Sequence, residues 1–71
     1  MALCHLLKYC KEMAKKYPSL RTELSDIYDM TADTCQEEGV SETNECDLAV
    51  NEIKEVVAAH EAALRAGVAK R

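Results

Sequence analysis

The sequence predicts an all-α protein, a three-helix bundle in which a pair of cysteines closes a helical hairpin. Two glycines and one proline in 71 residues are too few turn residues for an all-β fold. Apolar residues recur at steps of three and four in three separate stretches, which is the spacing of one helix face. We expect a single domain over residues 1–71, with a core that is marginal without a staple or a partner subunit.

The first helix is predicted over about residues 2–17. Its apolar stripe consists of Leu3, Leu7, Cys10, Ala14 and Tyr17. Pro18 ends this helix, because a proline disfavours helical backbone at the residue before it. Since Cys10 lies on the stripe, we interpret it as a core residue.

The second and third helices are predicted over about residues 19–37 and 43–66. Ser19 is a plausible N-cap of the second helix, and Gly39 is placed to end it. The stripe of the second helix is formed by Leu20, Leu24, Ile27 and Thr31. The stripe of the third is formed by Cys46, Val50, Ile53, Val57, His60, Leu64 and Gly67. We interpret His60 as a partly buried, hydrogen-bonded structural histidine.

Cys35 and Cys46 bracket an acidic turn between the second and third helices. Folding one helix back on the other about Gly39 places these cysteines opposite each other, together with the two apolar stripes. A disulfide requires Cα atoms within about 7 Å, and this register brings the pair together. Closing the loop would stabilise the fold by roughly 3 kcal/mol in the chain-entropy model. We therefore predict a redox-sensitive staple at the mouth of the hairpin.

Cys4 is a further candidate redox residue, because an antiparallel first helix puts it at the same end of the bundle. Lys8 follows Cys4 by one helical turn, and we consider Cys4 a thiol that exchanges with a Cys35–Cys46 bond. A cysteine without a role at a helix end is the alternative. With His5, the three cysteines would also make a zinc set, although the short Cys spacings of structural zinc sites are lacking. A metal-binding bundle is thus an alternative, and we predict no metal site.

The net charge of −4 is unevenly distributed. The first helix is basic, whereas the second helix and the turn are acidic. We predict an acidic docking surface for a protein partner, formed by Asp26, Asp29, Asp33, Glu37 and Glu38. Ordinary solvated faces of opposite sign are the alternative. No basic stripe coincides with stacking aromatics, so we expect no nucleic-acid partner.

Several function classes find no support in the sequence. No oxyanion-stabilising loop or orienting third residue accompanies a Cys–His pair, so we expect no enzyme and no cofactor. No stretch reaches the roughly 18 apolar residues of a membrane span, and the apolar start is too short for a signal peptide. A cytoplasmic or plastid-stroma location is expected, where static disulfides are uncommon. A secreted, disulfide-stapled effector or ligand is the alternative, and the long third helix also offers a surface for a homodimer.

Residues 35–60 resemble a known family. The segment begins with Cys35 and an acidic turn that contains Gly39. It continues with a Ser-x-x-x-Glu-Cys segment that ends at Cys46, and with the helix Leu-Ala-Val-Asn-Glu-Ile-Lys-Glu-Val over 48–56. This order is similar to the N-terminal cysteine hairpin of the small Calvin-cycle linker proteins. The resemblance implies a disulfide-closed hairpin. It also implies a protein that ties phosphoribulokinase to glyceraldehyde-3-phosphate dehydrogenase under oxidising conditions. The residues that would match the family's motif helix are Asn51, Ile53, Glu55 and Val56. The family's Trp-Asp is Val50-Asn51 in this chain, and no cysteine follows Cys46.

These observations together predict a redox-sensitive helical protein-interaction module that is not an enzyme. It would bind a protein, a metabolic enzyme if the resemblance holds, through the acidic hairpin that the two cysteines bracket.

Overall fold

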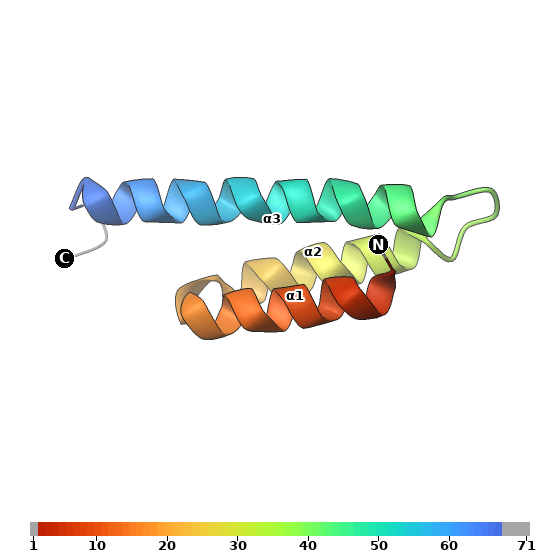
Figure 1. The fold of residues 1–71 in the computed structure, drawn as a ribbon, viewed down its shortest axis with the longest axis horizontal. Coiled ribbons are helices and arrows are strands. Elements are labelled where there is room, and N and C mark those ends of the chain that lie inside the picture. Colours follow the sequence, from red (N-terminus) through yellow and green to blue (C-terminus); the bar gives the residue numbers. More distant parts are fainter. Residues whose placement is uncertain (1, 68–71) are drawn as a thin grey trace.

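The computed structural model describes residues 2–67 and contains three α-helices, which confirms the predicted all-helical class. Helix α1 spans Leu3–Lys16, α2 spans Arg21–Thr34 and α3 spans Glu42–Arg65, with a short 3-10 turn, η1, at Pro18–Leu20 (Figure 1). No strand occurs between residues 2 and 67.

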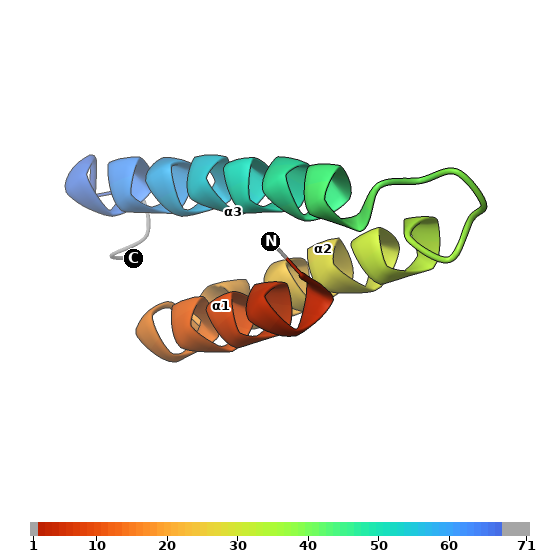
Figure 2. The ribbon, with the colours of Figure 1, turned by 45° about the vertical axis from the view of Figure 1, so that its right-hand side comes forward.

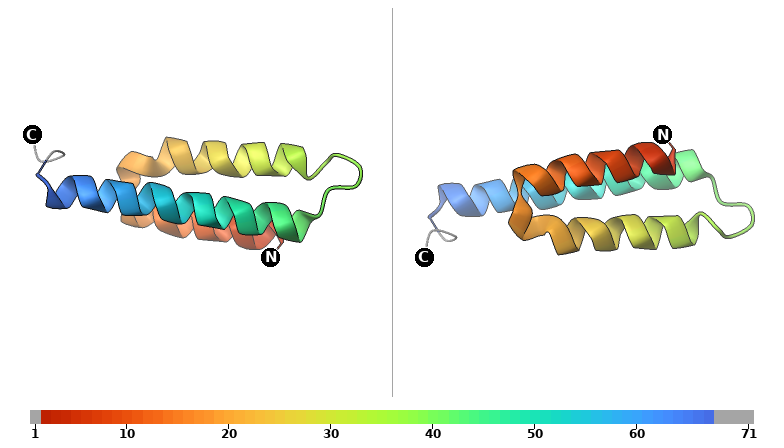
Figure 3. Two further views of the ribbon diagram at one scale, coloured as in Figure 1. Left: turned by 90° about the horizontal axis from the view of Figure 1, so that it is seen from above. Right: turned by 90° about the horizontal axis from the view of Figure 1, so that it is seen from below.

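The three helices lie side by side, and the chain reverses direction at each connection. η1 turns α1 back into α2, and the turn at residues 35–41 leads into α3, so that α2 is antiparallel to both other helices (Figures 1 and 3). Helix α3 has 24 residues and α1 and α2 have 14 each, which corresponds to lengths of about 36 Å and 21 Å. Helix α3 therefore extends past the α1–α2 connection, and the molecule measures 46 × 17 × 16 Å.

All three helices and η1 contribute to one apolar core. Its buried members are Leu6, Cys10, Leu20, Leu24, Ile27, Cys46, Ala49 and Ile53. Thr31 is also buried, and its hydroxyl donates a hydrogen bond of 2.8 Å to the carbonyl oxygen of Ile27. The buried hydroxyl is thus satisfied within its own helix.

The centre of the core is displaced from the predicted stripes. Leu6 and Ala49 lie at the edges of those stripes, yet they are buried, whereas Val50 and Val57 are only half-buried. Each helix packs against two neighbours, so its buried face is centred between them rather than on one partner. His60 is half-buried, and its ring packs edge-on against Tyr17 with the ring centroids 5.6 Å apart.

The ends of α2 differ from the prediction. Residues 18–20 form the 3-10 turn, so that α2 begins at Arg21, and it ends at Thr34 instead of residue 37. The backbone N–H of Cys35 donates to the carbonyl oxygen of Thr31, which closes the last helical turn. Gly39 lies in the following turn with φ of +80°, several residues beyond the position of a helix cap. Cys35 therefore belongs to the start of the turn and not to the helix.

Helix α3 begins slightly earlier than predicted because Ser41 caps it. The Ser41 hydroxyl accepts a hydrogen bond of 3.3 Å from the backbone N–H of Asn44, which satisfies one of the N–H groups that lack a partner within the helix. Glu42 and Glu45 follow in the first turn, where negative charge is favourable next to the helix N-terminus.

Candidate functional site: the cysteine-bracketed hairpin

The two hairpin cysteines lie on opposite sides of the turn and differ in burial. Cys35 follows the end of α2 and is half-buried, whereas Cys46 lies in the second turn of α3 and is completely buried. The two thiols are close enough that a negative charge on Cys35 raises the pKa of Cys46. No disulfide joins the four cysteines in the structure, and the closed form of the hairpin stays a proposal.

The surroundings of both thiols oppose ionisation. Burial is the main cause that raises the pKa of Cys35, and the carboxylates of Glu42 and Glu45 raise it further. Burial also dominates at Cys46, followed by the charge of Cys35 and that of Glu42. The thiolate is the form that attacks disulfides and alkylating reagents. At neutral pH both residues are therefore protonated, weakly nucleophilic thiols.

This electrostatic setting predicts how the thiols react as pH changes. Because the pKa of Cys35 lies above the ordinary value of 9.0, its thiolate fraction and hence its alkylation rate should still be rising above that pH. The completely buried Cys46 should react more slowly, because the hairpin must open before the reagent reaches it. Iodoacetamide labelling of reduced protein between pH 7 and pH 10.5, followed by peptide mass mapping, measures each cysteine separately. In denaturant the rates should converge. A rate for Cys35 that levels off below pH 9, or a rate for Cys46 in folded protein as high as in denaturant, would contradict the prediction.

Cys4 and His5 lie at the same end of the molecule but face solvent. The backbone N–H of Leu3 donates a hydrogen bond of 2.8 Å to the Glu42 carboxylate, which holds the start of α1 next to the start of α3. The Cys4 thiol is exposed while that of Cys46 is buried, so direct exchange at the Cys46 sulfur would require the hairpin to open. Among residues 2–67, no three His, Cys, Asp or Glu side chains are grouped to hold a metal ion. The alternative of a Cys/His metal centre therefore finds no support in the part of the chain described.

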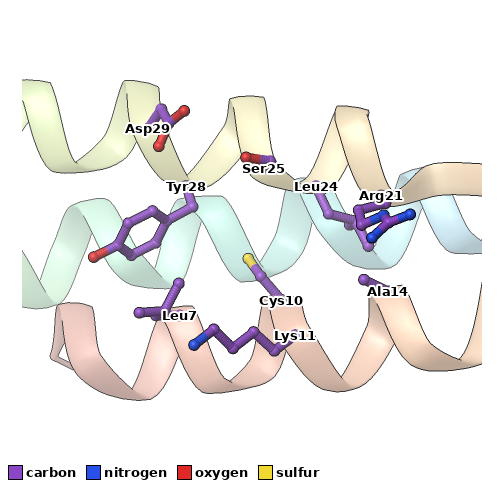
Figure 4. Close-up of a pocket in the computed structure, with 9 residues that line it drawn as sticks. All are labelled: Leu7, Cys10, Lys11, Ala14, Arg21, Leu24, Ser25, Tyr28 and Asp29. Carbon is purple, nitrogen blue, oxygen red and sulfur yellow. The ribbon is translucent and has the colours of Figure 1, made fainter. Parts of the chain in front are cut away.

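The five predicted docking residues are all exposed. Three of them, Asp26, Asp29 and Asp33, share one face of α2, because they follow one another at steps of three and four. Asp29 borders a hollow between α1 and α2, together with Lys11 and Arg21 (Figure 4). Asp26 and Asp33 are on the side of α2 turned away from the Leu24–Ile27–Thr31 face, as their spacing requires. The remaining pair is in the turn, which projects beyond the start of α1 (Figure 2); these residues are Glu37 and Glu38.

The hollow between α1 and α2 has an apolar floor and a mixed rim. Figure 4 shows Leu7 and Cys10 of α1 facing Leu24 and Tyr28 of α2, in a space of about 280 Å³. Burial raises the pKa of Cys10, which is consistent with the predicted role of this residue in the core. Because Lys11, Arg21 and Asp29 all line this hollow, its rim carries charges of both signs.

A second hollow, between α2 and α3, was not predicted from the sequence. Two of the apolar side chains that line it are unusually exposed: Met30 is 71% exposed and Leu48 is 62% exposed. The space measures about 250 Å³ and is also lined by Ile27, Thr31, Thr34, Glu45, Ala49 and Glu52. The signal in the sequence was that Met30 and Leu48 fall outside the apolar stripes of their helices, on faces that are otherwise polar.

No family model matches the chain, and no curated protein or solved structure shows a significant match to it. Within residues 2–67, none of the helices combines the length and the apolar character needed to cross a membrane.

Proposed function

We propose that the protein is a non-enzymatic, redox-sensitive interaction module. Its hairpin of α2, the turn and α3 would be closed by a Cys35–Cys46 disulfide under oxidising conditions. The observation that carries this proposal is the position of the two cysteines on either side of the turn, close enough that a charge on Cys35 raises the pKa of Cys46. The hairpin mouth also carries exposed carboxylates at Glu37 and Glu38.

Oxidation would join the two sulfur atoms, with two protons and two electrons passing to an oxidant such as a small disulfide or a peroxide. Cys46 is held by its complete burial in the core, while Cys35 is half-buried and lies just outside the regular helix. High thiol pKa values slow attack by these cysteines and make them poor leaving groups in reduction. The pair would therefore form a slow and persistent closure, unlike the low-pKa cysteines of rapid oxidoreductases.

The acidic residues of the hairpin would guide the approach of a basic partner surface. Charges at an exposed rim act mainly on the association rate and are screened by salt. The resemblance of residues 35–60 to the linker family supports a metabolic enzyme as the partner. A secreted helical effector uses the same staple, and the two proposals differ in the redox state in which the native protein is found.

The test is binding of oxidised and reduced protein to glyceraldehyde-3-phosphate dehydrogenase, the partner that the resemblance implies. We expect oxidised protein to bind more tightly, and Glu37→Lys with Glu38→Lys to slow association by about 3–10-fold at low salt, because opposite charges steer the encounter. Glu12→Lys, an exposed reversal on α1, is the matched control and should have little effect. Surface plasmon resonance at two salt concentrations measures both rates. Binding that ignores redox state, salt and the turn charges would overturn the proposal.

A further inference from the structure

We propose that the groove between α2 and α3 binds a basic amphipathic helix of another protein, which places an apolar side chain between Met30 and Leu48. This inference rests on the proposed function as an interaction module and names the contact surface and the chemistry of the partner. It assigns binding to the flank of the hairpin, in addition to the acidic turn at its tip.

The apolar part of the site consists of two side chains that the fold leaves without cover. Met30 and Leu48 are far more exposed than the other large apolar residues of α2 and α3 in the hairpin region, and they line one hollow. Helix α1 packs on the other side of the α2–α3 pair, since every pair of helices is in contact around one core (Figure 3). A further helix could therefore pack in the groove, with one of its apolar side chains inserted between the ridges formed by Met30 and Leu48.

The rim of the groove determines the charge of the partner. Positions three, four and seven residues from a helical residue lie on its own face. At these spacings from Met30 and from Leu48 there is no lysine or arginine. Among the residues that line the groove, Glu45 and Glu52 are acidic and none is a lysine or an arginine. A helix that sets apolar residues into the groove would therefore be favoured if lysine or arginine flanks them.

A second copy of the chain fits this groove less well. Pairing the groove with itself would oppose two acidic rims, which is repulsive. The exposed basic residues of α1, Lys8, Lys11, Lys15 and Lys16, have no exposed large apolar side chain among them, because the exposed large apolar residues of the described chain are Met30, Leu48 and Leu64. We therefore place the partner helix on another protein.

The experiment uses labelled synthetic helical peptides and fluorescence anisotropy at low salt. The test peptide has leucines at helical spacing with lysines on either side, and two controls replace the lysines by glutamates or scramble the order. We expect the first peptide alone to bind well. Leu48→Ala and Met30→Ala should each weaken binding by about 5–10-fold, which corresponds to about 1–1.4 kcal/mol. Leu64→Ala, the other exposed apolar residue, should leave the affinity unchanged.

Several outcomes would contradict the proposal that this groove binds a basic helix. One is equal binding of the scrambled peptide, which would mean attraction by charge alone. Another is binding that neither Leu48→Ala nor Met30→Ala weakens. A third is self-association in sedimentation that Leu48→Ala abolishes, which would make a second copy the occupant. The redox proposal is tested separately, because Glu37→Lys with Glu38→Lys acts on enzyme binding by oxidised protein, whereas the peptide is tested on reduced protein. Failure of the peptide-binding proposal therefore does not decide the redox proposal, and the reverse also holds.

Discussion

Replacing Ile53 with alanine is expected to lower the free energy of unfolding by about 2–5 kcal/mol, through lost burial and the cavity left behind. Ile53 is completely buried in the core shared by all three helices. A chain of 71 residues has a total stability of roughly 4–11 kcal/mol at the usual value per residue. The variant should therefore lose a large part of its stability, and urea unfolding followed by circular dichroism measures the loss.

Leu48→Ala is the matched control for this measurement. Leu48 is on the same helix and is also a large apolar residue, but its side chain is 62% exposed. Its truncation should change the stability by no more than about 0.5 kcal/mol. Similar losses for Ile53→Ala and Leu48→Ala would contradict the arrangement of the core around α3.

The second large effect is expected for Cys46→Ser, and its size should depend on the redox conditions. In reductant, the serine hydroxyl would be buried where the thiol is completely enclosed, at a cost of about 1–3 kcal/mol if it finds no hydrogen bond. Under oxidising conditions the variant would also lack the staple, which would add roughly 3 kcal/mol to the difference from wild type. Thermal unfolding with and without reductant measures the two contributions.

Cys35→Ser separates the staple from the packing. Cys35 is only half-buried, so this variant should resemble wild type in reductant and lose the same redox-dependent stability as Cys46→Ser under oxidation. Wild-type stability that does not change with reductant would show that no staple forms. A cost of Cys35→Ser in reductant equal to that of Cys46→Ser would contradict the difference in burial between the two thiols.

The three helices were predictable from the sequence because each has apolar residues with the helical period. The ends of the helices and the centre of the core were harder to predict from the sequence. Gly39 and Ser41 are both plausible boundary residues, and which of them ends or starts a helix depends on how the turn packs. The half-buried position of Val57 and the burial of Ala49 follow from the presence of a third helix, and a stripe read along one helix does not contain that information.

The candidate site was predictable in part for the same reason. The register of two helices about a turn suggested that Cys35 and Cys46 approach each other, and the influence of one thiol on the other agrees with their proximity. The placement of the acidic residues was predictable in part. The spacing of Asp26, Asp29 and Asp33 puts them on one face of α2, whereas the hollow that Asp29 borders depends on how α1 packs against α2. The groove at Met30 was missed because an exposed methionine has no meaning until its neighbour on another helix is known.

The backbone at Gly39 sets a stereochemical requirement on the turn. Its φ of +80° is the mirror image of an ordinary conformation, and a β-carbon built on this residue meets no atom within 4 Å. Steric space therefore does not restrict the residue type at this position; the left-handed backbone conformation does. Among the common amino acids only those that tolerate left-handed backbone, asparagine and aspartate after glycine itself, suit such a site. The turn that joins the two cysteines thus selects its central residue by chirality, whatever the size of the side chain.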